Sequence, residues 1–140
     1  MLEIVVHTDG ASRGNPGPAA MAYTISGIDE SRVELKKQLG TTTNNQAEYQ
    51  AMVAATDYLA DNVLESATIS FFADSELMIK QLRGEYRMKD ALLRPHYEKI
   101  LSNIRTLNNR GVYTSFTAVR RAENKRADEL CNLALDGQGD

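Results

Sequence analysis

The sequence predicts an α/β fold with a five-stranded mixed sheet and helices on both faces of that sheet. Short runs of apolar and β-branched residues alternate with longer segments in which apolar residues recur every three or four positions. Their order along the chain is β-β-β-α-β-α-α-β-α. Strands linked through helices run parallel with right-handed crossovers, whereas the first three strands follow one another through turns and should form an antiparallel meander.

Turn signals separate the first three predicted strands. Leu2 to Thr8 is an apolar run that ends at Asp9-Gly10, a common turn dipeptide. Asn15-Pro16-Gly17-Pro18 is a second turn signal, so the next strand should run from Ala19 to about Ser26. The third strand fits Arg32 to Thr41, where apolar and charged residues interleave as in an edge strand.

The middle of the chain predicts a helix, a strand and a short helix. Thr43 to about Ala60 has a helical period, and either Thr42 or Thr43 can cap the helix. Ala67 to Ala73 is β-branched and aromatic, which favours a strand. Asp74-Ser75 is a helix start signal for Glu76 to about Leu82.

The last third of the chain predicts two helices on either side of a final strand. Pro95 fits the first turn of a helix that ends near Asn109. Gly111 then begins the connection to a strand from Val112 to Val119, and the last helix runs from about Asn124 to Leu135.

Composition excludes several classes of protein. The length of 140 residues fits one compact domain, which we expect to extend over residues 1 to 140. We find no apolar run long enough to span a membrane and no basic leader, so we expect a cytoplasmic protein without a membrane partner. A single cysteine excludes a disulfide framework and a zinc site of several thiolates. The net charge of −3 argues against a non-specific nucleic-acid coat protein.

Four carboxylates fall where such a sheet keeps its binding crevice. Asp9 closes the first strand and Asp74 the fourth, so both would lie at one edge if these strands are neighbours. Glu48 and Asp128, in the first turns of two helices, can reach that edge. Taken singly, each has an ordinary alternative: Asp-Gly is a turn dipeptide, Asp74 a helix cap, and the other two favourable charges near helix N-termini.

Together the four carboxylates indicate a metal site. Converging carboxylates repel one another and need cations to stay ionised. Oxygen ligands without sulfur suit Mg²⁺ or Mn²⁺ rather than zinc. Two such ions about 4 Å apart can activate a water and stabilise the leaving oxygen of a phosphoryl displacement. We therefore expect a phosphodiester-cleaving site that uses Mg²⁺ or Mn²⁺.

Four segments surround these carboxylates: Thr8 to Pro18, Thr42 to Glu48, Ala73 to Leu77, and Asn124 to Leu130. In this order and spacing they resemble the signature segments of type 1 ribonuclease H, in its compact prokaryotic form without a basic insertion. The resemblance runs from residue 2 to about 135. It implies the ribonuclease H-like fold and endonucleolytic hydrolysis of the RNA strand of an RNA-DNA hybrid, leaving 5′-phosphate and 3′-hydroxyl ends.

The resemblance also implies roles for particular residues. The four carboxylates match the family's catalytic metal ligands, and Asp9 would bridge both Mg²⁺ ions. Three asparagines match contacts in the minor groove of the hybrid, where short amides suit a ribose 2′-hydroxyl. Thr43 matches a position that grips a DNA-strand phosphate. The expected substrate contacts are Ser12, Asn15, Thr43, Asn44, Asn45, Glu76, Tyr86 and Arg121.

Three features depart from many family members. Leu82 to His96 is too short for the basic, Trp-rich insertion. Hybrid binding should then either be weaker or rely on Arg83, Arg87 and Lys89, with Tyr86 as a sugar-stacking aromatic. The loop before Asp128 holds no histidine, and that role is either vacant or taken by Arg121 or Glu123. A glutamate, Glu76, stands where many relatives have glutamine.

The sequence leaves two other functions open. A non-catalytic module that binds hybrids would keep the fold, and so would a nuclease acting on duplex DNA, as in transposases, integrases and junction nucleases. The expected partner is an RNA-DNA hybrid, with double-stranded RNA as an open second substrate, and the expected state is a monomer.

Overall fold

The computed structural model describes residues 1 to 137 and confirms the predicted α/β architecture. The last three residues of the predicted domain, 138 to 140, lie outside the described residues. Five strands form one sheet in the order β3-β2-β1-β4-β5. The first three pair antiparallel, whereas β4 runs parallel to β1 and β5 parallel to β4. The strands are β1 (Leu2–Ser12), β2 (Gly17–Ser26), β3 (Val33–Thr42), β4 (Ala67–Ala73) and β5 (Val112–Ala118).

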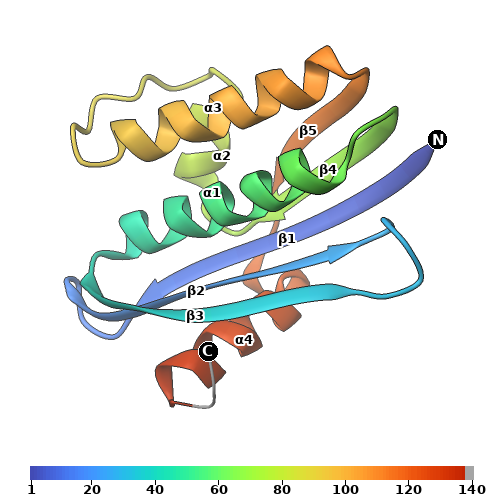
Figure 1. Cartoon of the computed structure of the whole chain (residues 1–140). Helices are drawn as coiled ribbons and strands as arrows, with labels where there is room; N and C mark the ends of the chain where they lie inside the picture. The colour runs from blue at the N-terminus through green and yellow to red at the C-terminus, as the bar shows by residue number, and fades with distance from the viewer. Residues whose placement is uncertain (138–140) are drawn as a thin grey trace.

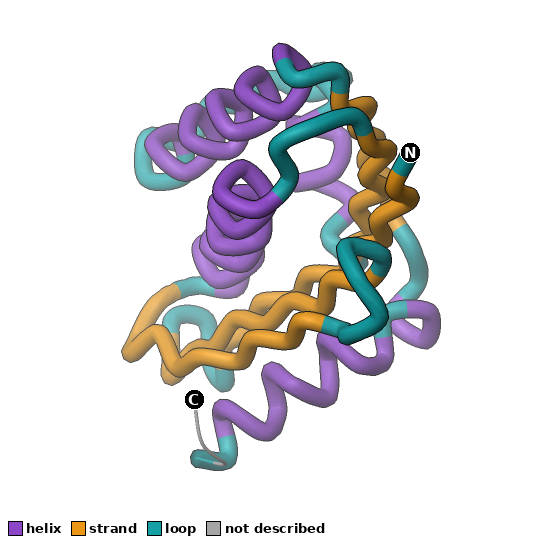
Figure 2. The backbone as a smooth tube through the Cα atoms, turned by 45° about the vertical axis from the view of Figure 1, so that its right-hand side comes forward, coloured by secondary structure: helices purple, strands orange, loops and turns teal. Residues whose placement is uncertain are grey.

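Helices cover both faces of the sheet, as predicted (Figure 1). One face carries α1 (Asn44–Asn62), α2 (Glu76–Leu82) and α3 (Arg94–Asn109), and the other carries α4 (Lys125–Leu135). Figure 2 shows α1 and α3 side by side, with α4 across the sheet from them. A short 3₁₀ helix, η1 (Arg121–Glu123), precedes α4 and was not predicted. Within residues 1 to 137, no helix has both the length and the apolar character needed to cross a bilayer.

The predicted turn at Asp9-Gly10 is wrong. β1 continues through both residues to Ser12, because they stay paired with β2. The parallel partner of β1 ends earlier, since Thr8 opposite Ala73 is the last pair with β4. Beyond Thr8, β1 therefore extends past β4 and is paired along one edge only, with β2. β2 likewise begins at Gly17, two residues before its predicted start.

The main apolar core lies between the sheet and the helices of one face. Side chains of β4 alternate between this core and the opposite face, as the period of a strand requires. Stacked rings of Phe71 and Phe116, with centroids 4.8 Å apart, join β4 to β5. The large buried residues of this core include Ile4, Val6, Tyr49, Met52, Leu59, Ile69, Phe71, Ile100 and Leu107. The core fixes β1, β4 and α1 relative to one another, and the ends of these three elements meet in the pocket described below.

Gly10 allows the backbones of β1 and α1 to touch. A Cβ atom at this position would lie 2.2 Å from the carbonyl carbon of Ala47 and 2.3 Å from the amide nitrogen of Glu48. Both are backbone atoms, so they cannot rotate away as the end of a flexible side chain could. A glycine inside a strand commonly marks such a close backbone approach.

We expect Gly10→Ala to lower the free energy of unfolding by about 3 kcal/mol or more, because the methyl group must push α1 away from β1. Gly40→Ala is the matched control, since its φ of +74° strains an L-residue but a Cβ there meets no described atom within 4 Å. The control should lose only about 1–2 kcal/mol. Urea denaturation measures both, and equal losses would contradict the steric account.

Candidate active site

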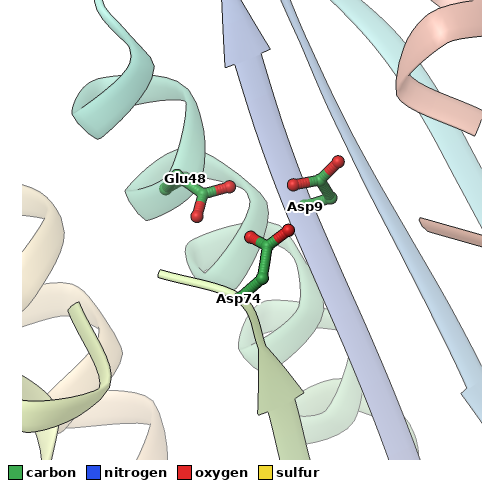
Figure 3. A group of neighbouring side chains, drawn as sticks. All are labelled: Asp9, Glu48 and Asp74. Carbon is green, nitrogen blue, oxygen red and sulfur yellow. The ribbon is translucent and has the colours of Figure 1, made fainter. Parts of the chain in front are cut away.

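Three acidic side chains converge at one end of the sheet, and their carboxylates point toward one another (Figure 3). Asp9 comes from β1, Asp74 directly follows β4, and Glu48 lies in the second turn of α1. One carboxylate oxygen of each lies within 4.8 Å of those of the other two. The parallel pairing of β1 with β4 ends one residue before each aspartate. This pairing places the two aspartates at one edge, as the sequence led us to expect.

The fourth predicted carboxylate, Asp128, lines the same pocket but stands outside the group of three. This pocket has a volume of about 260 Å³ and includes Asn44, Asn45 and Arg121 in its lining. Asp128 belongs to the first turn of α4 and accepts a hydrogen bond from Arg121, with 3.0 Å between Nη2 and Oδ1. Its charge contributes to the raised pKa of Asp9, so the two carboxyl groups are within electrostatic reach of each other.

Burial raises the pKa of all three converging carboxyl groups, and the charge of a neighbouring carboxylate adds to the effect on each. Asp9 is 5% exposed, and burial, followed by the charge of Asp74, raises its pKa to about 7. Burial is also the main reason that the pKa of Glu48 lies well above its usual value, and the charge of Asp9 is the second. Burial raises the pKa of Asp74, while the Arg121 guanidinium acts in the opposite direction. A divalent cation at this position would favour the ionised form of all three.

Local backbone contacts hold Glu48 against β1. The N–H of Gly10 donates to Glu48 Oε1 at 2.5 Å. Thr43 caps α1, as predicted, because its Oγ1 accepts from the N–H of Gln46 at 3.2 Å. The part played by Gly10 was not predicted, although a glycine inside a strand is a signal of close backbone approach.

The cap of α2 leaves the Asp74 carboxylate available to the pocket. Ser75 Oγ accepts from the N–H of Met78 at 3.3 Å, so Ser75 is the N-cap of this helix. The alternative in which Asp74 serves as the cap is therefore wrong. The alternative of a turn at Asp9 fails as well, because Asp9 is a paired residue of β1.

Three predicted substrate residues form a hydrogen-bonded surface beside the carboxylates. Asn44 Oδ1 accepts from the N–H of Ser12 at 2.8 Å and from its hydroxyl at 3.1 Å. The N–H of Asn44 donates to Asn15 Oδ1 at 3.0 Å. The loop that follows β1 is thereby fixed to the start of α1.

Glu76 and Tyr86 are joined through Lys80. The Lys80 Nζ atom lies 2.8 Å from Glu76 Oε1, 3.4 Å from the Tyr86 hydroxyl and 5.1 Å from the centroid of the Tyr86 ring. Hydrogen bonding to Lys80 lowers the pKa of Glu76. The charge of this glutamate is thus paired within α2, and Tyr86 remains 49% exposed.

Comparison with known proteins decides the family. A family model described as RNase H matches residues 2 to 135. The chain belongs to the RNase H family. Among curated relatives it is 41% identical over 129 residues to ribonuclease HI of Halobacterium salinarum, which covers 91% of this chain and 62% of the relative. The bifunctional protein Rv2228c of Mycobacterium tuberculosis is 35% identical over 138 residues, covering 96% of this chain and 36% of the relative. The chain thus spans less than two thirds of each of these relatives.

Solved structures of RNase H proteins share the fold over nearly the whole chain. RNase H1 from Halobacterium salinarum superposes with a TM-score of 0.81 and 39% identity, covering 96% of this chain and 98% of that one. LC11-RNase H1, solved in complex with an RNA/DNA hybrid, gives a TM-score of 0.82 and 34% identity with the same coverage. Both matches confirm the predicted ribonuclease H-like fold.

The raised pKa of Asp9 predicts how stability without divalent cations depends on pH. The pKa of its carboxyl group is ordinarily 3.8 and is about 7 in the folded protein. The protonated group therefore contributes fully to stability below pH 3.8, and this contribution is lost as pH rises through about 7. At pH 8, we expect the free energy of unfolding of Asp9→Asn to exceed that of the parent by about 2–4 kcal/mol. Near pH 4, the two free energies of unfolding should differ little.

Urea denaturation in EDTA at several pH values measures this dependence. Asp61→Asn, at an exposed carboxylate of α1, is the control and should follow the parent. If Asp9→Asn lost stability between pH 4 and 8 as steeply as the parent, the loss would not come from ionisation of Asp9.

Proposed function

We propose that this chain is an endoribonuclease that hydrolyses the RNA strand of RNA-DNA hybrids with two divalent cations, leaving 5′-phosphate and 3′-hydroxyl ends. The convergence of Asp9, Glu48 and Asp74 carries the proposal, because three oxygen ligands so close together suit a hard cation. Membership of the RNase H family supports this class of reaction. The hybrid in the LC11-RNase H1 structure supports this class of substrate.

The donor set fits Mg²⁺, with Mn²⁺ as a substitute, since it is built from carboxylates without thiolate or imidazole. Asp9, Glu48 and Asp74 would hold one cation, and Asp9 with Asp128 would hold the other. When bound, such a pair lowers the pKa of a water and stabilises the leaving oxygen of a phosphodiester. The buried position of Asp9 between its partners suits a ligand that both cations share.

The residues beside the carboxylates are suited to recognise the hybrid. The Oδ1 atom of Asn44 is occupied by Ser12, so we assign its Nδ2 group, together with Asn15 and Asn45, to the ribose 2′-hydroxyls of the RNA strand. Thr43 Oγ1 accepts from a backbone amide, which leaves its hydroxyl hydrogen for a phosphate of the DNA strand.

Arg121 belongs to the loop before Asp128, which holds no histidine where many bacterial relatives have one. A guanidinium stays protonated at neutral pH, so it cannot take up a proton as an imidazole does. Its position beside Asp128 and Asp74 suits a phosphate contact instead. We assign Arg121 to the scissile phosphate before cleavage and to the phosphate end afterwards.

A basic groove follows α2, where the longer family members have their insertion. Its lining includes Tyr86 and three cationic residues, Arg87, Lys89 and Arg94, against one acidic residue, Glu85, and its volume is about 680 Å³. Two side chains hold the backbone of the segment that lines this groove. Gln81 donates to the carbonyl of Arg87 at 3.4 Å, and Arg94 donates to the carbonyl of Met88 at 2.5 Å. We assign this groove to the phosphates of the hybrid, with Tyr86 against a sugar.

With Mg²⁺ present, we expect cleavage of a labelled RNA strand in a hybrid and no cleavage of duplex DNA. Asp9→Asn should lower kcat/KM by about 10³-fold, because bound cations contribute several kcal/mol to the transition state. Asp61→Asn should keep the parent's rate. Gel analysis of a panel of hybrid, duplex DNA and double-stranded RNA measures all of these and decides whether double-stranded RNA is a second substrate.

Three outcomes of this panel would contradict the proposal. Equal cutting of hybrid and duplex DNA would favour a DNA nuclease. Hybrid binding that weakens with salt, without turnover under any divalent cation, would favour a binding module. Cleavage that persists in EDTA would exclude the role given to the cations.

A further inference from the structure

Asp128 reaches the pocket from the opposite side of the sheet to Glu48. Glu48 belongs to α1, on one face of the sheet, and Asp128 belongs to α4, on the other (Figure 1). Asp9 belongs to β1, within the sheet. The separation of Asp128 from Asp9 therefore depends on how α4 is docked onto β1.

Asn124 makes the docking contact at the start of α4. Asn124 is 1% exposed, and its Nδ2 group donates to the carbonyl of Thr8 at 2.9 Å. Its own carbonyl accepts from the N–H of Asp128 at 3.1 Å. A single residue thus connects the neighbour of Asp9 in the sequence with the turn that carries Asp128.

The Asn124 side chain makes this contact instead of capping α4. Asparagine before a helix commonly caps it by accepting a backbone N–H bond, but no such bond from Asn124 exists in the described chain. Its Oδ1 atom, like Oγ1 of Thr8, is buried and has no hydrogen-bond partner among residues 1 to 137. Buried polar atoms without partners are rare because they destabilise a fold, so each calls for an explanation. The link to β1 provides one for Asn124.

Cys131 makes a second contact with β1, about two turns further along α4. Its Sγ atom lies 3.3 Å from the carbonyl oxygen of Asp9. Burial raises the pKa of this thiol, which therefore keeps its hydrogen. A thiol is a weak donor, so the amide of Asn124 is the stronger of the two links. Two consecutive carbonyls of β1 are thereby joined to α4.

We propose that Asn124 is a positioning residue that fixes the separation of Asp128 from Asp9, and thereby sets the affinity for the divalent cation that these two carboxylates share. The proposal rests on the two-cation function given above. Groups that orient metal ligands without touching the metal commonly change affinity or activity by about 10–100-fold when they are removed.

Asn124→Ser distinguishes positioning from stability. A serine hydroxyl can cap α4 but is too short to reach the carbonyl of Thr8. We expect a thermal midpoint close to that of the parent. We also expect a rise of about 10-fold or more in the Mg²⁺ concentration for half-maximal cleavage, with the KM for the hybrid unchanged. Asn124→Ala, which also lacks the cap, should lower the thermal midpoint and give the same shift in Mg²⁺ dependence.

Mn²⁺ titration followed by electron paramagnetic resonance measures cation binding without cleavage. The position at Asp9 and Asp128 has two carboxylates against three at the other, so it should be the weaker class of Mn²⁺ site. This class should lose affinity in Asn124→Ser, and the tighter class should keep it. Asn103→Ala is the matched control, because Asn103 is also buried and donates to Thr56 and Asp57 between α3 and α1. Asn103→Ala should lower the thermal midpoint and leave the Mg²⁺ dependence of cleavage and the Mn²⁺ affinities unchanged.

The outcomes distinguish this proposal from the proposed function. Parent-like Mg²⁺ dependence and Mn²⁺ affinities in Asn124→Ser would overturn the positioning role and leave the function intact. A parent protein that binds two classes of Mn²⁺ but cuts no hybrid would overturn the function, while the Mn²⁺ affinities of Asn124→Ser would still decide positioning. A parent that binds no Mn²⁺ would overturn both.

Discussion

The backbone contact between β1 and α1 at Gly10 is the constraint on which the rest of the site depends. It brings the start of α1 so close to the strand that the N–H of Gly10 bonds to Glu48, and it thereby sets that carboxylate beside Asp9. The parallel pairing of β1 with β4 adds Asp74 from the other direction. The apolar core beneath these elements prevents them from moving apart. The three carboxylates are therefore held together although they repel one another.

This arrangement explains why the pocket combines burial with charge. Without cations the carboxyl groups keep protons that ordinary aspartate and glutamate lose, as the raised pKa values of Asp9 and Glu48 show. A divalent cation changes the repulsion between them into a shared attraction. Asp128 differs because Arg121 pairs with it at 3.0 Å and already compensates its charge. A cation between Asp9 and Asp128 would lie next to that guanidinium, so the placement of α4 matters more for this position than for the other.

Much of the fold and all four acidic residues of the pocket could be predicted from sequence, because the signals are local, although only three of the four lie in the close group. The alternation of apolar residues marks β4, and a threonine before a helical period marks the cap of α1. The turn predicted at Asp9-Gly10 failed because this dipeptide favours turns locally, whereas its pairing with β2 is a tertiary interaction. The bond from Asn124 to Thr8 spans 116 residues, and no periodicity or local motif encodes such a contact.

The central claim is that carboxylates distant in the chain gather to hold a pair of divalent cations. A crystal structure with Mn²⁺, in which anomalous scattering locates the metal, tests it most directly. The account predicts one peak among Asp9, Glu48 and Asp74 and a second between Asp9 and Asp128. Crystals that contain Mn²⁺ but show no peak in this pocket, or carboxylates that lie on separate faces of the molecule, would contradict it.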